Sequence, residues 1–500
     1  MICLYRILVA IQGYSRHLQL QVGGLRLNTI LGAVHIMSCY VYELPTTGNI
    51  SFSEILLDQT GQYTHAIANA TAARSSLRAA LKESKRTEDG ERDHLKIIKI
   101  IDDYLPHLYG IIECVDADDL QTRTHPVFSW RTTLSANILN TSPRQSVTGL
   151  FSDLAFTLLT YGSALCNLAA SSVTSLGQYE RERAITDAQR KVKDEKLNFS
   201  VQLFLKAAGV FSHVAESVIP QWERALEESN VKADPLMGLR PVEFNRELVL
   251  ALSRFSMAEA QTLAIRKLLT KSAYDSTLTP GPPLPKSHPS PKLIAKLSLN
   301  ALENYSSALS LAKGARGGLQ GNTEVTKDIT RWLGDETTLA SALSHKWLGV
   351  DAGEQSSTPG KAGESIGFLQ WAKTELEDLK DGGHGISGLR RKEKRRERVS
   401  EEIESTSSFL SHYKKLNNTL HFEPIPPIAT LQSLIPTGTP AVTLKPFTPP
   451  SPAFRPSSST TGLSVEPQVN GEGDNSREVD HIVQGDSTAP NSGSTRSVYF

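Results

Sequence analysis

A short glycine-rich stretch is the part of the sequence that comes nearest to a nucleotide-binding motif. Residues 383–388 are Gly-His-Gly-Ile-Ser-Gly and match the pattern GxGxxG. In dinucleotide-binding folds this pattern follows a strand and opens a helix, whose N-terminal amides bind a pyrophosphate. Here a charged helical segment precedes the pattern and an arginine-rich run follows it. This context favours a loop between two helices, and a nucleotide-dependent enzyme is kept only as a minor alternative.

The residues that could act as nucleophiles, bases or metal ligands do not gather into a motif. The sequence contains no HExxH, GxSxG or P-loop pattern, and its 13 histidines do not cluster. Cys166 lies among alanines and leucines, an apolar setting that raises a thiol pKa and disfavours the reactive thiolate. His213 lies inside a predicted helix, and Asp102 and Asp103 are adjacent carboxylates typical of a solvated helix. We therefore expect a protein that is not an enzyme, with no catalytic residues, no metal site and no cofactor.

Balanced charge argues against a general affinity for nucleic acid. The chain has 53 Lys and Arg against 53 Asp and Glu, so we expect no nucleic-acid partner. One basic run, residues 390–398, could be a nuclear signal or a patch for anionic lipid. Glutamates lie within and directly after this run, which favours the solvated face of a helix. The four cysteines form no CxxC pair, which favours a reducing compartment and no structural zinc.

Helical periodicity dominates the middle of the chain, with the segment 247–269 at its centre. Its apolar residues fall on two adjoining stripes, which together are too wide for a helix that lies on a surface. Its many alanines allow other helices to approach closely. Similar spacing predicts helices at 63–81, 94–115 with a kink or break at Pro106, 150–173, 180–196 as a charged helix or an extension of one, 201–219 ending at Pro220, 292–313, 325–349, 363–380 and 400–416. Successive hairpins of this kind are typical of a stacked array, in which function usually lies on an outer surface.

The two ends of the chain differ from this helical body. Residues 1–43 lack its periodicity, and two interpretations stay open: a genuine leader, or an extension of the gene model with the real start at Met37. Residues 44–60 fit a short strand or the entry of a helix, and we place the folded domain at 44–428. From 429 to 500, Pro, Ser, Thr and Gly dominate. This tail buries too little apolar surface to offset its ordering entropy and is predicted to be disordered.

Six blocks of the helical body, in this order, resemble the BRO domain of ALIX-like proteins. They are Phe128-Ser129-Trp130 with the helix to Val173, and then residues 206–218, 257–269, 292–309, 363–373 and 417–427. The resemblance covers nearly the whole predicted domain. It implies an all-α fold, an extended banana-shaped array of TPR-like helical hairpins with room for a small β element near its N-terminus. The opening residues 44–52 are similar to a fungal branch of the family that acts in the response to ambient alkaline pH.

The resemblance implies one partner, the C-terminal amphipathic helix of the main polymerising subunit of ESCRT-III. In the family, a phenylalanine near the end of one helix and two aliphatic residues on the next form an apolar patch on the concave face. The aliphatic positions match Leu293 and Leu297 here, and the phenylalanine position matches Ala264, with Ile265 beside it. Periodicity alone would make both leucines core residues, whereas the resemblance places them on a surface that binds a helix. On that hypothesis, Leu297→Asp abolishes binding in a domain that stays folded.

The implied function is that of a non-enzymatic adaptor in fungal alkaline-pH signalling. Such an adaptor helps to assemble the complex that leads to proteolytic activation of a pH-responsive transcription factor. A plasma-membrane pH-sensing complex is a further expected partner. We expect a cytoplasmic protein that its partners recruit to cortical plasma-membrane or endosomal sites. A general ESCRT adaptor in endosomal sorting, of the ALIX type, is the alternative within the family.

Overall fold

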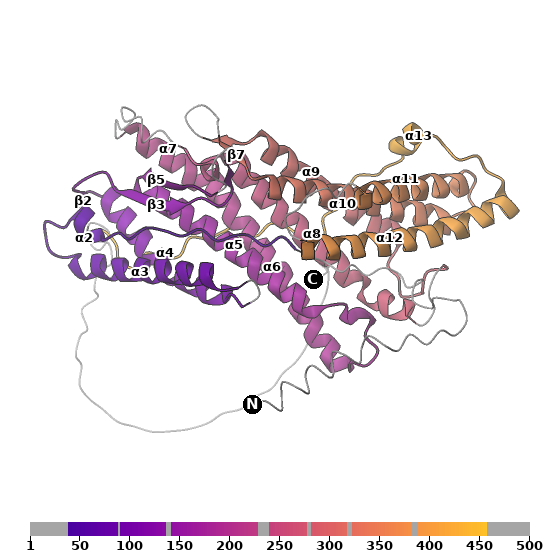
Figure 1. The fold of residues 1–500 in the computed structure, drawn as a ribbon, viewed down its shortest axis with the longest axis horizontal. Helices are drawn as coiled ribbons and strands as arrows, with labels where there is room; N and C mark the ends of the chain where they lie inside the picture. The colour runs from indigo at the N-terminus through magenta and orange to yellow at the C-terminus, as the bar shows by residue number, and fades with distance from the viewer. Residues whose placement is uncertain are drawn as a thin grey trace, which may run out of the picture. The chain divides into compact units, whose positions relative to one another are not determined.

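The structure of the protein is a computed structural model (Figure 1). It describes residues 39–88, 91–136, 142–228, 240–277, 282–317, 323–381 and 389–457. Residues 1–38, the glycine-rich stretch at 383–388 and the chain from 458 onward lie outside this description, so the expectations for them stay predictions.

Long helices make up most of the described residues, and they pack on one another largely in chain order (Figure 1). Their bounds are α3 Thr64–Arg86, α4 His94–Asp116, α5 Leu150–Leu176, α6 Asp187–His213, α7 Ile219–Glu228, α8 Arg246–Ser276, α9 Pro291–Gly314, α10 Lys327–Glu354, α11 Lys361–Asp381 and α12 Leu389–Leu416. From α8 onward each helix packs on the next one, and α6 packs on both α5 and α8. The prediction of an all-α array of helical hairpins is confirmed.

The helix α8 lies between α6 and α9, as its wide apolar face predicted. Most of its side chains are buried, including those of Ala258, Ala260 and Ala264. Ser253 donates a hydrogen bond to the Ala208 carbonyl oxygen of α6 at 2.8 Å. Small side chains on α8 let both neighbours come close, so the helix is held on two sides.

The two prolines that were expected to interrupt helices lie inside helical segments. Pro106 is within the single helix α4. Pro220 is the second residue of α7, where the lack of an N–H is tolerated. A wider π-helical turn, Val214–Val218, joins α6 to α7 and lets the helical path continue through this point.

Short strands form a small β element beside the first helices, which the sequence allowed for. Strand β3 (Val127–Arg131) pairs antiparallel with β5 (Arg144–Thr148), and Thr47 makes an isolated bridge to Trp130. Strand β1 (Leu56–Leu57), directly after the short helix α2 (Phe52–Ile55), pairs with β2 (Gln121–Thr122). A third sheet has the order β4 (Ser135–Ala136), β7 (Thr323–Val325) and β6 (Arg316–Gly317). Phe128 and Trp130 of β3 are fully buried, as expected of residues that anchor this segment to the core.

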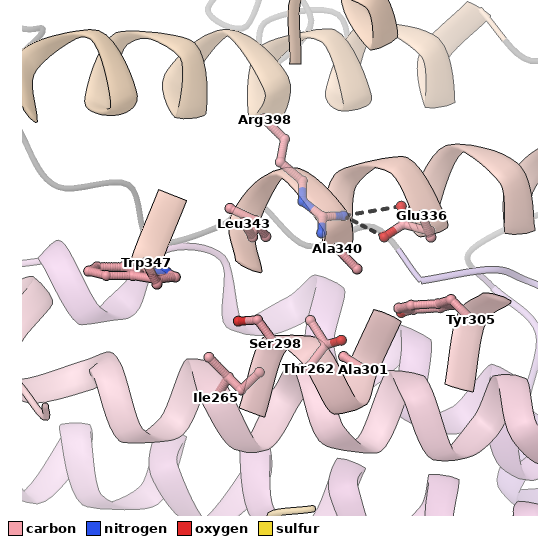
Figure 2. Close-up of a pocket in the computed structure, with 10 residues that line it drawn as sticks. All are labelled: Thr262, Ile265, Ser298, Ala301, Tyr305, Glu336, Ala340, Leu343, Trp347 and Arg398. Atoms are coloured by element: carbon pink, nitrogen blue, oxygen red, sulfur yellow. Dashed lines mark hydrogen bonds and ion pairs between the residues drawn. The ribbon is translucent and has the colours of Figure 1, made fainter. Parts of the chain in front are cut away.

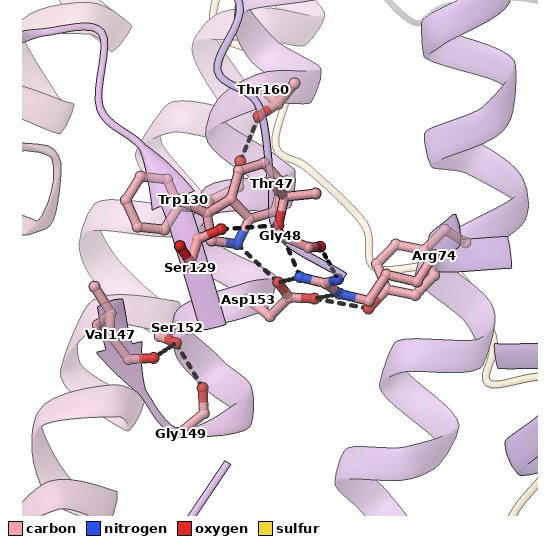
Figure 3. Close-up of polar contacts among 12 residues, drawn as sticks. Thr47, Gly48, Arg74, Ser129, Trp130, Val147, Gly149, Ser152, Asp153 and Thr160 are labelled. Carbon is pink, nitrogen blue, oxygen red and sulfur yellow. Dashed lines mark hydrogen bonds and ion pairs between the residues drawn. The ribbon is translucent and has the colours of Figure 1, made fainter. Parts of the chain in front are cut away.

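A buried ion pair connects the β element to the first helices (Figure 3). Asp153, in the first turn of α5, accepts hydrogen bonds from Arg74 Nε at 3.0 Å and Nη2 at 2.8 Å. It also accepts from the indole N–H of Trp130 at 2.8 Å and the Tyr104 hydroxyl at 2.7 Å. Four donors and the helix N-terminus balance the charge of this fully buried carboxylate. The pair therefore joins α3, α4 and β3 to α5.

Two segments pass a length and hydropathy test for membrane-spanning helices, although no uninterrupted apolar run of that length occurs. They are Leu150–Arg181 and Arg246–Ser276, and 83% of the apolar window of each is buried inside the protein. Both segments are core helices of the array, which explains their composition.

The chain after α12 lies against the helices, which corrects the expectation of a disordered tail from residue 429. Helix α13 (Ile428–Ser433) packs on α11. Residues 434–456 then continue with little regular structure, and we call them the strap. The strap donates backbone hydrogen bonds from Thr439 to the Lys296 carbonyl oxygen at 3.0 Å and from Ala453 to that of Pro106 at 2.9 Å.

The strap is ordered by the helices beneath it and not by its own composition. Its few apolar side chains are spaced along it: Val442 is buried, and the ring of Phe454 lies 6.0 Å from that of Tyr63. An estimate based on the segment's own apolar content omits the apolar surface that α4, α6 and α9 offer to it. The compact unit to which the described helices belong accordingly extends to residue 456.

Candidate partner-binding site

The four predicted site residues differ in their access to solvent. Leu293, in the first turn of α9, is 41% exposed. Leu297 follows one turn later and is only 3% exposed, and Ile265 and Ala264 of α8 are 6% and 1% exposed. Ile265 and Leu297 belong to one apolar cluster, whereas Ala264 packs into the main core. Ile265 and Leu297 therefore lie in the same buried cluster, and Leu293 is the predicted site residue whose side chain solvent can reach.

The strap lies across α8 and α9 next to these residues. Ile435 and Ala441 pack against the apolar cluster that contains Ile265 and Leu297. The Gln261 side chain of α8 donates to the carbonyl oxygens of Leu297 at 3.1 Å and of Thr439 at 3.3 Å. It also accepts the backbone N–H of Ala441 at 2.8 Å. One glutamine therefore joins α8, α9 and the strap.

Close backbone contact fixes the strap on α9. A side chain at Gly438 would place its Cβ 2.7 Å from the backbone nitrogen of Asn300. At this separation the strap or the helix backbone would have to move. Glycine at this position lets the strap approach the helix backbone closely enough for the bond from Thr439 to Lys296. The sequence analysis missed Gln261, Gly438 and Thr439. A glycine two residues before a proline, in a Pro-rich stretch, gave no signal of tertiary contact.

A small cavity lies between α8, α9, α10 and α12, and Ile265 forms part of its wall (Figure 2). Its volume is about 20 Å³, which is room for one water molecule and not for an organic ligand. Arg398 of α12 contacts both carboxylate oxygens of Glu336 of α10 at 3.3 Å across it. Tyr305 also lines the cavity and donates to the buried Glu259 of α8 at 3.1 Å. Burial, and then the charge of Glu336, raise the pKa of Glu259 to about 8, so this carboxyl is mostly protonated at neutral pH.

Two arginines of the predicted basic run form ion pairs with a neighbouring helix. Arg398 pairs with Glu336, and Arg395 pairs with Asp335. The predicted solvated face, balanced by glutamates of the same helix, is therefore wrong for these two arginines. Their acidic partners stand on α10, on which α12 packs.

A larger apolar groove of about 580 Å³ lies between α4, α5, α6 and the strap. Leu95 of α4 and Phe199 of α6 line it and are 45% and 50% exposed. Its charged lining residues are Lys206, Lys445 and Asp102. Phe199 lies two residues after the buried Leu197, off the buried face of α6, and this offset is the signal that could have identified it.

The two candidate catalytic groups singled out in the sequence, Cys166 and His213, lie on α5 and α6. Cys166 is buried, and burial raises the pKa of its thiol to about 12, which confirms the expected loss of reactivity. Burial also lowers the pKa of His213, which contacts the strap ring Phe447. Within the described ranges, no three His, Cys, Asp or Glu residues are placed to hold a metal ion.

The comparison with known proteins gives the family. The sequence signature of the BRO1-like domain matches residues 50–462. The chain belongs to the BRO1-like domain family. The match extends past residue 428 through the strap, in agreement with the structure, so the strap is a part of this BRO1-like domain.

Individual relatives of this BRO1-like protein carry one name. The pH-response regulator protein palC of Cryptococcus neoformans var. neoformans serotype D is 36% identical, over 84% of this chain and 94% of the relative. The palC protein of Emericella nidulans is 26% identical, over 90% of this chain and 97% of the relative. A solved ALIX BRO1 CHMP4C complex is 17% identical with a TM-score of 0.55, covering 84% of this chain and 99% of that one. That structure supports the fold, and the predicted resemblance to the ALIX-like family is confirmed.

Proposed function

We propose that this protein is a non-enzymatic adaptor in fungal alkaline-pH signalling. The observation that carries the proposal is the 36% identity to a pH-response regulator palC over 84% of the chain. Further support comes from the buried Cys166 thiol, a poor nucleophile because burial raises its pKa. The adaptor acts in the cytoplasm and is recruited by its partners to cortical plasma-membrane or endosomal sites.

The partner we propose is the C-terminal amphipathic helix of the main polymerising ESCRT-III subunit. The BRO1 domain of ALIX, which shares this fold, has been solved in a complex with CHMP4C. On this chain we assign the helix to the face of α8 and α9 that carries Leu293, Leu297 and Ile265, with Ala264 behind it in the core. Leu293 is the apolar side chain that a partner reaches first, because it is 41% exposed. A plasma-membrane pH-sensing complex is a further proposed partner.

A calorimetric titration of the full chain with a peptide of that ESCRT-III helix tests the partner. Wild-type protein is expected to bind with a Kd of about 1 μM, and Leu293→Asp to weaken binding at least about tenfold, which corresponds to ~1.4 kcal/mol. Val192→Asp is the matched control, because Val192 is 63% exposed on α6, away from α9. Equal binding by Leu293→Asp and wild type would rule out the proposed site. No binding by wild type would rule out the proposed partner.

A fungal deletion strain tests the pathway. Loss of an alkaline-pH adaptor abolishes growth at alkaline pH and stops cleavage of the pH-responsive transcription factor, while endosomal cargo sorting continues. A sorting defect with normal cleavage would instead establish a general ESCRT adaptor of the ALIX type.

A further inference from the structure

The strap and the proposed partner occupy the same face of the protein. The strap donates to Lys296 of α9, shares Gln261 of α8 with Leu297, and packs Ile435 and Ala441 against the cluster around Leu297. We propose that residues 434–456 are a displaceable intramolecular cover of the partner-binding face, so that the strap and the partner helix exclude each other. This inference rests on the proposed function and adds its regulation.

The strap reduces the apolar surface that α8 and α9 present to a partner. With the strap in place, Leu293 is the exposed apolar residue of the proposed site, since Leu297 and Ile265 are 3% and 6% exposed. An amphipathic helix that binds in a groove needs a row of apolar anchors and not one side chain. On this inference, removal of the strap takes Ile435 and Ala441 away from the cluster that contains Leu297, one turn from Leu293, and so adds a second anchor to that row.

The attachment of the strap suits a segment that can leave. The strap has no regular helix or strand pairing, and its hydrogen bonds are separate points: the amides of Thr439, Ala441 and Ala453, the Lys445 side chain with Gln202, and the Arg455 carbonyl oxygen with Tyr63. Side chains between these points are exposed, including Leu444 at 40%. Segments with few buried contacts open locally without unfolding of the domain.

Two glycines lie at two separate close contacts of the strap, one with α9 and one with α6. Gly438 of the strap meets the backbone of Asn300, where an added Cβ would lie 2.7 Å from the nitrogen. Gly209 of α6 meets the strap from below, where the Lys445 carbonyl oxygen occupies the place of a Cβ. Gly438→Leu is therefore expected to release the strap from α9, and Gly209→Ala to release its following part from α6.

The experiment uses the full chain and the peptide of the ESCRT-III C-terminal helix. Affinity is measured by calorimetry for wild type, Gly438→Leu, Gly209→Ala and a control, Thr443→Ala, whose side chain is exposed on the strap. Hydrogen exchange at the amides of Thr439 and Ala441 reports whether the strap is in place. We expect both release variants to bind about tenfold more tightly than wild type, because the competent state is no longer a minor population. Thr443→Ala is expected to bind as wild type does.

If a variant fails to fold, hydrogen exchange on the wild-type protein alone tests the inference. Bound peptide is expected to accelerate exchange at the amides of Thr439 and Ala441, and slower or unchanged exchange overturns the inference. Equal affinity for wild type and for folded variants with exposed amides also overturns it, while the proposed function stands. No binding by wild type or by either variant overturns the proposed function, and the inference fails with it.

Discussion

Leu293 and Leu297 stand one turn apart on α9, yet 41% of the first side chain is exposed and only 3% of the second. Leu297→Asp is therefore expected to lower the free energy of unfolding by about 1–2 kcal/mol, because the charge reaches water only when the strap is released. Leu293→Asp is expected to change it by less than about 1 kcal/mol. Urea unfolding followed by circular dichroism measures both. A wild-type unfolding midpoint for Leu297→Asp would contradict its burial.

The burial of Leu297 changes the expectation that Leu297→Asp affects binding alone. A loss of binding in that variant cannot be assigned to the surface alone, because the substitution also disturbs buried packing. Leu293→Asp is the variant that separates the two effects.

The sequence predicted the helices of the array well but not the strap that lies across α8 and α9. Periodicity located α8 and α9, because each buries a wide apolar face against neighbours on both sides. The cluster that contains Leu297 also contacts a segment more than 130 residues later, whose own composition is that of a disordered chain. No local pattern encodes that contact.

The partners of the basic run on α12 were missed for a related reason. Charges nearest in sequence suggested pairing within one helix. Arg398 instead reaches Glu336, because α12 packs on α10 and both side chains become buried there. Which helices meet is decided by the tertiary fold, and single-sequence periodicity does not contain it.

The buried pair of Arg74 and Asp153 is expected to be essential for stability. Asp153→Ala leaves the Arg74 guanidinium, 2% exposed, without its carboxylate and should cost about 3–5 kcal/mol. The comparison variant is Lys96→Ala, which breaks the half-exposed surface pair with Glu83 and should leave stability nearly unchanged. Urea unfolding measures both, and similar small losses would show that the buried pair is dispensable.

Stability is expected to depend on pH through Glu259. Its pKa is raised to about 8 by burial, so the folded state keeps a proton that the unfolded chain releases above about pH 4.3. Because the folded state binds more protons, stability falls by about 1 kcal/mol per pH unit as pH rises from 5 to 8, and then levels off. Tyr305 of α9, Glu336 of α10 and Arg398 of α12 are the neighbouring polar and charged groups, with Cys39 beside them.

Glu259→Gln tests that dependence, since glutamine can still accept the Tyr305 hydrogen bond and does not titrate. The variant is expected to show a flatter profile between pH 5 and 8 and to be more stable than wild type at pH 8. Unfolding in urea at pH 5.5, 7 and 8.5 gives the profile. Glu303→Gln, at an exposed position of α9, should keep the wild-type slope. An unchanged slope in Glu259→Gln would assign the dependence to another group.

Two glycines of α10 are expected to respond to alanine in opposite directions. A Cβ at Gly349 would lie 2.7 Å from the Leu369 side chain and 3.1 Å from two backbone atoms of α11. Gly349→Ala therefore forces α10 and α11 apart and should lower stability by about 1–3 kcal/mol. Gly334 has no atom within 4 Å of the same position, so Gly334→Ala should raise stability by about 0.5–1 kcal/mol through helix propensity. Thermal unfolding distinguishes the two, and a stabilised Gly349→Ala would mean that these helices can separate without loss of packing.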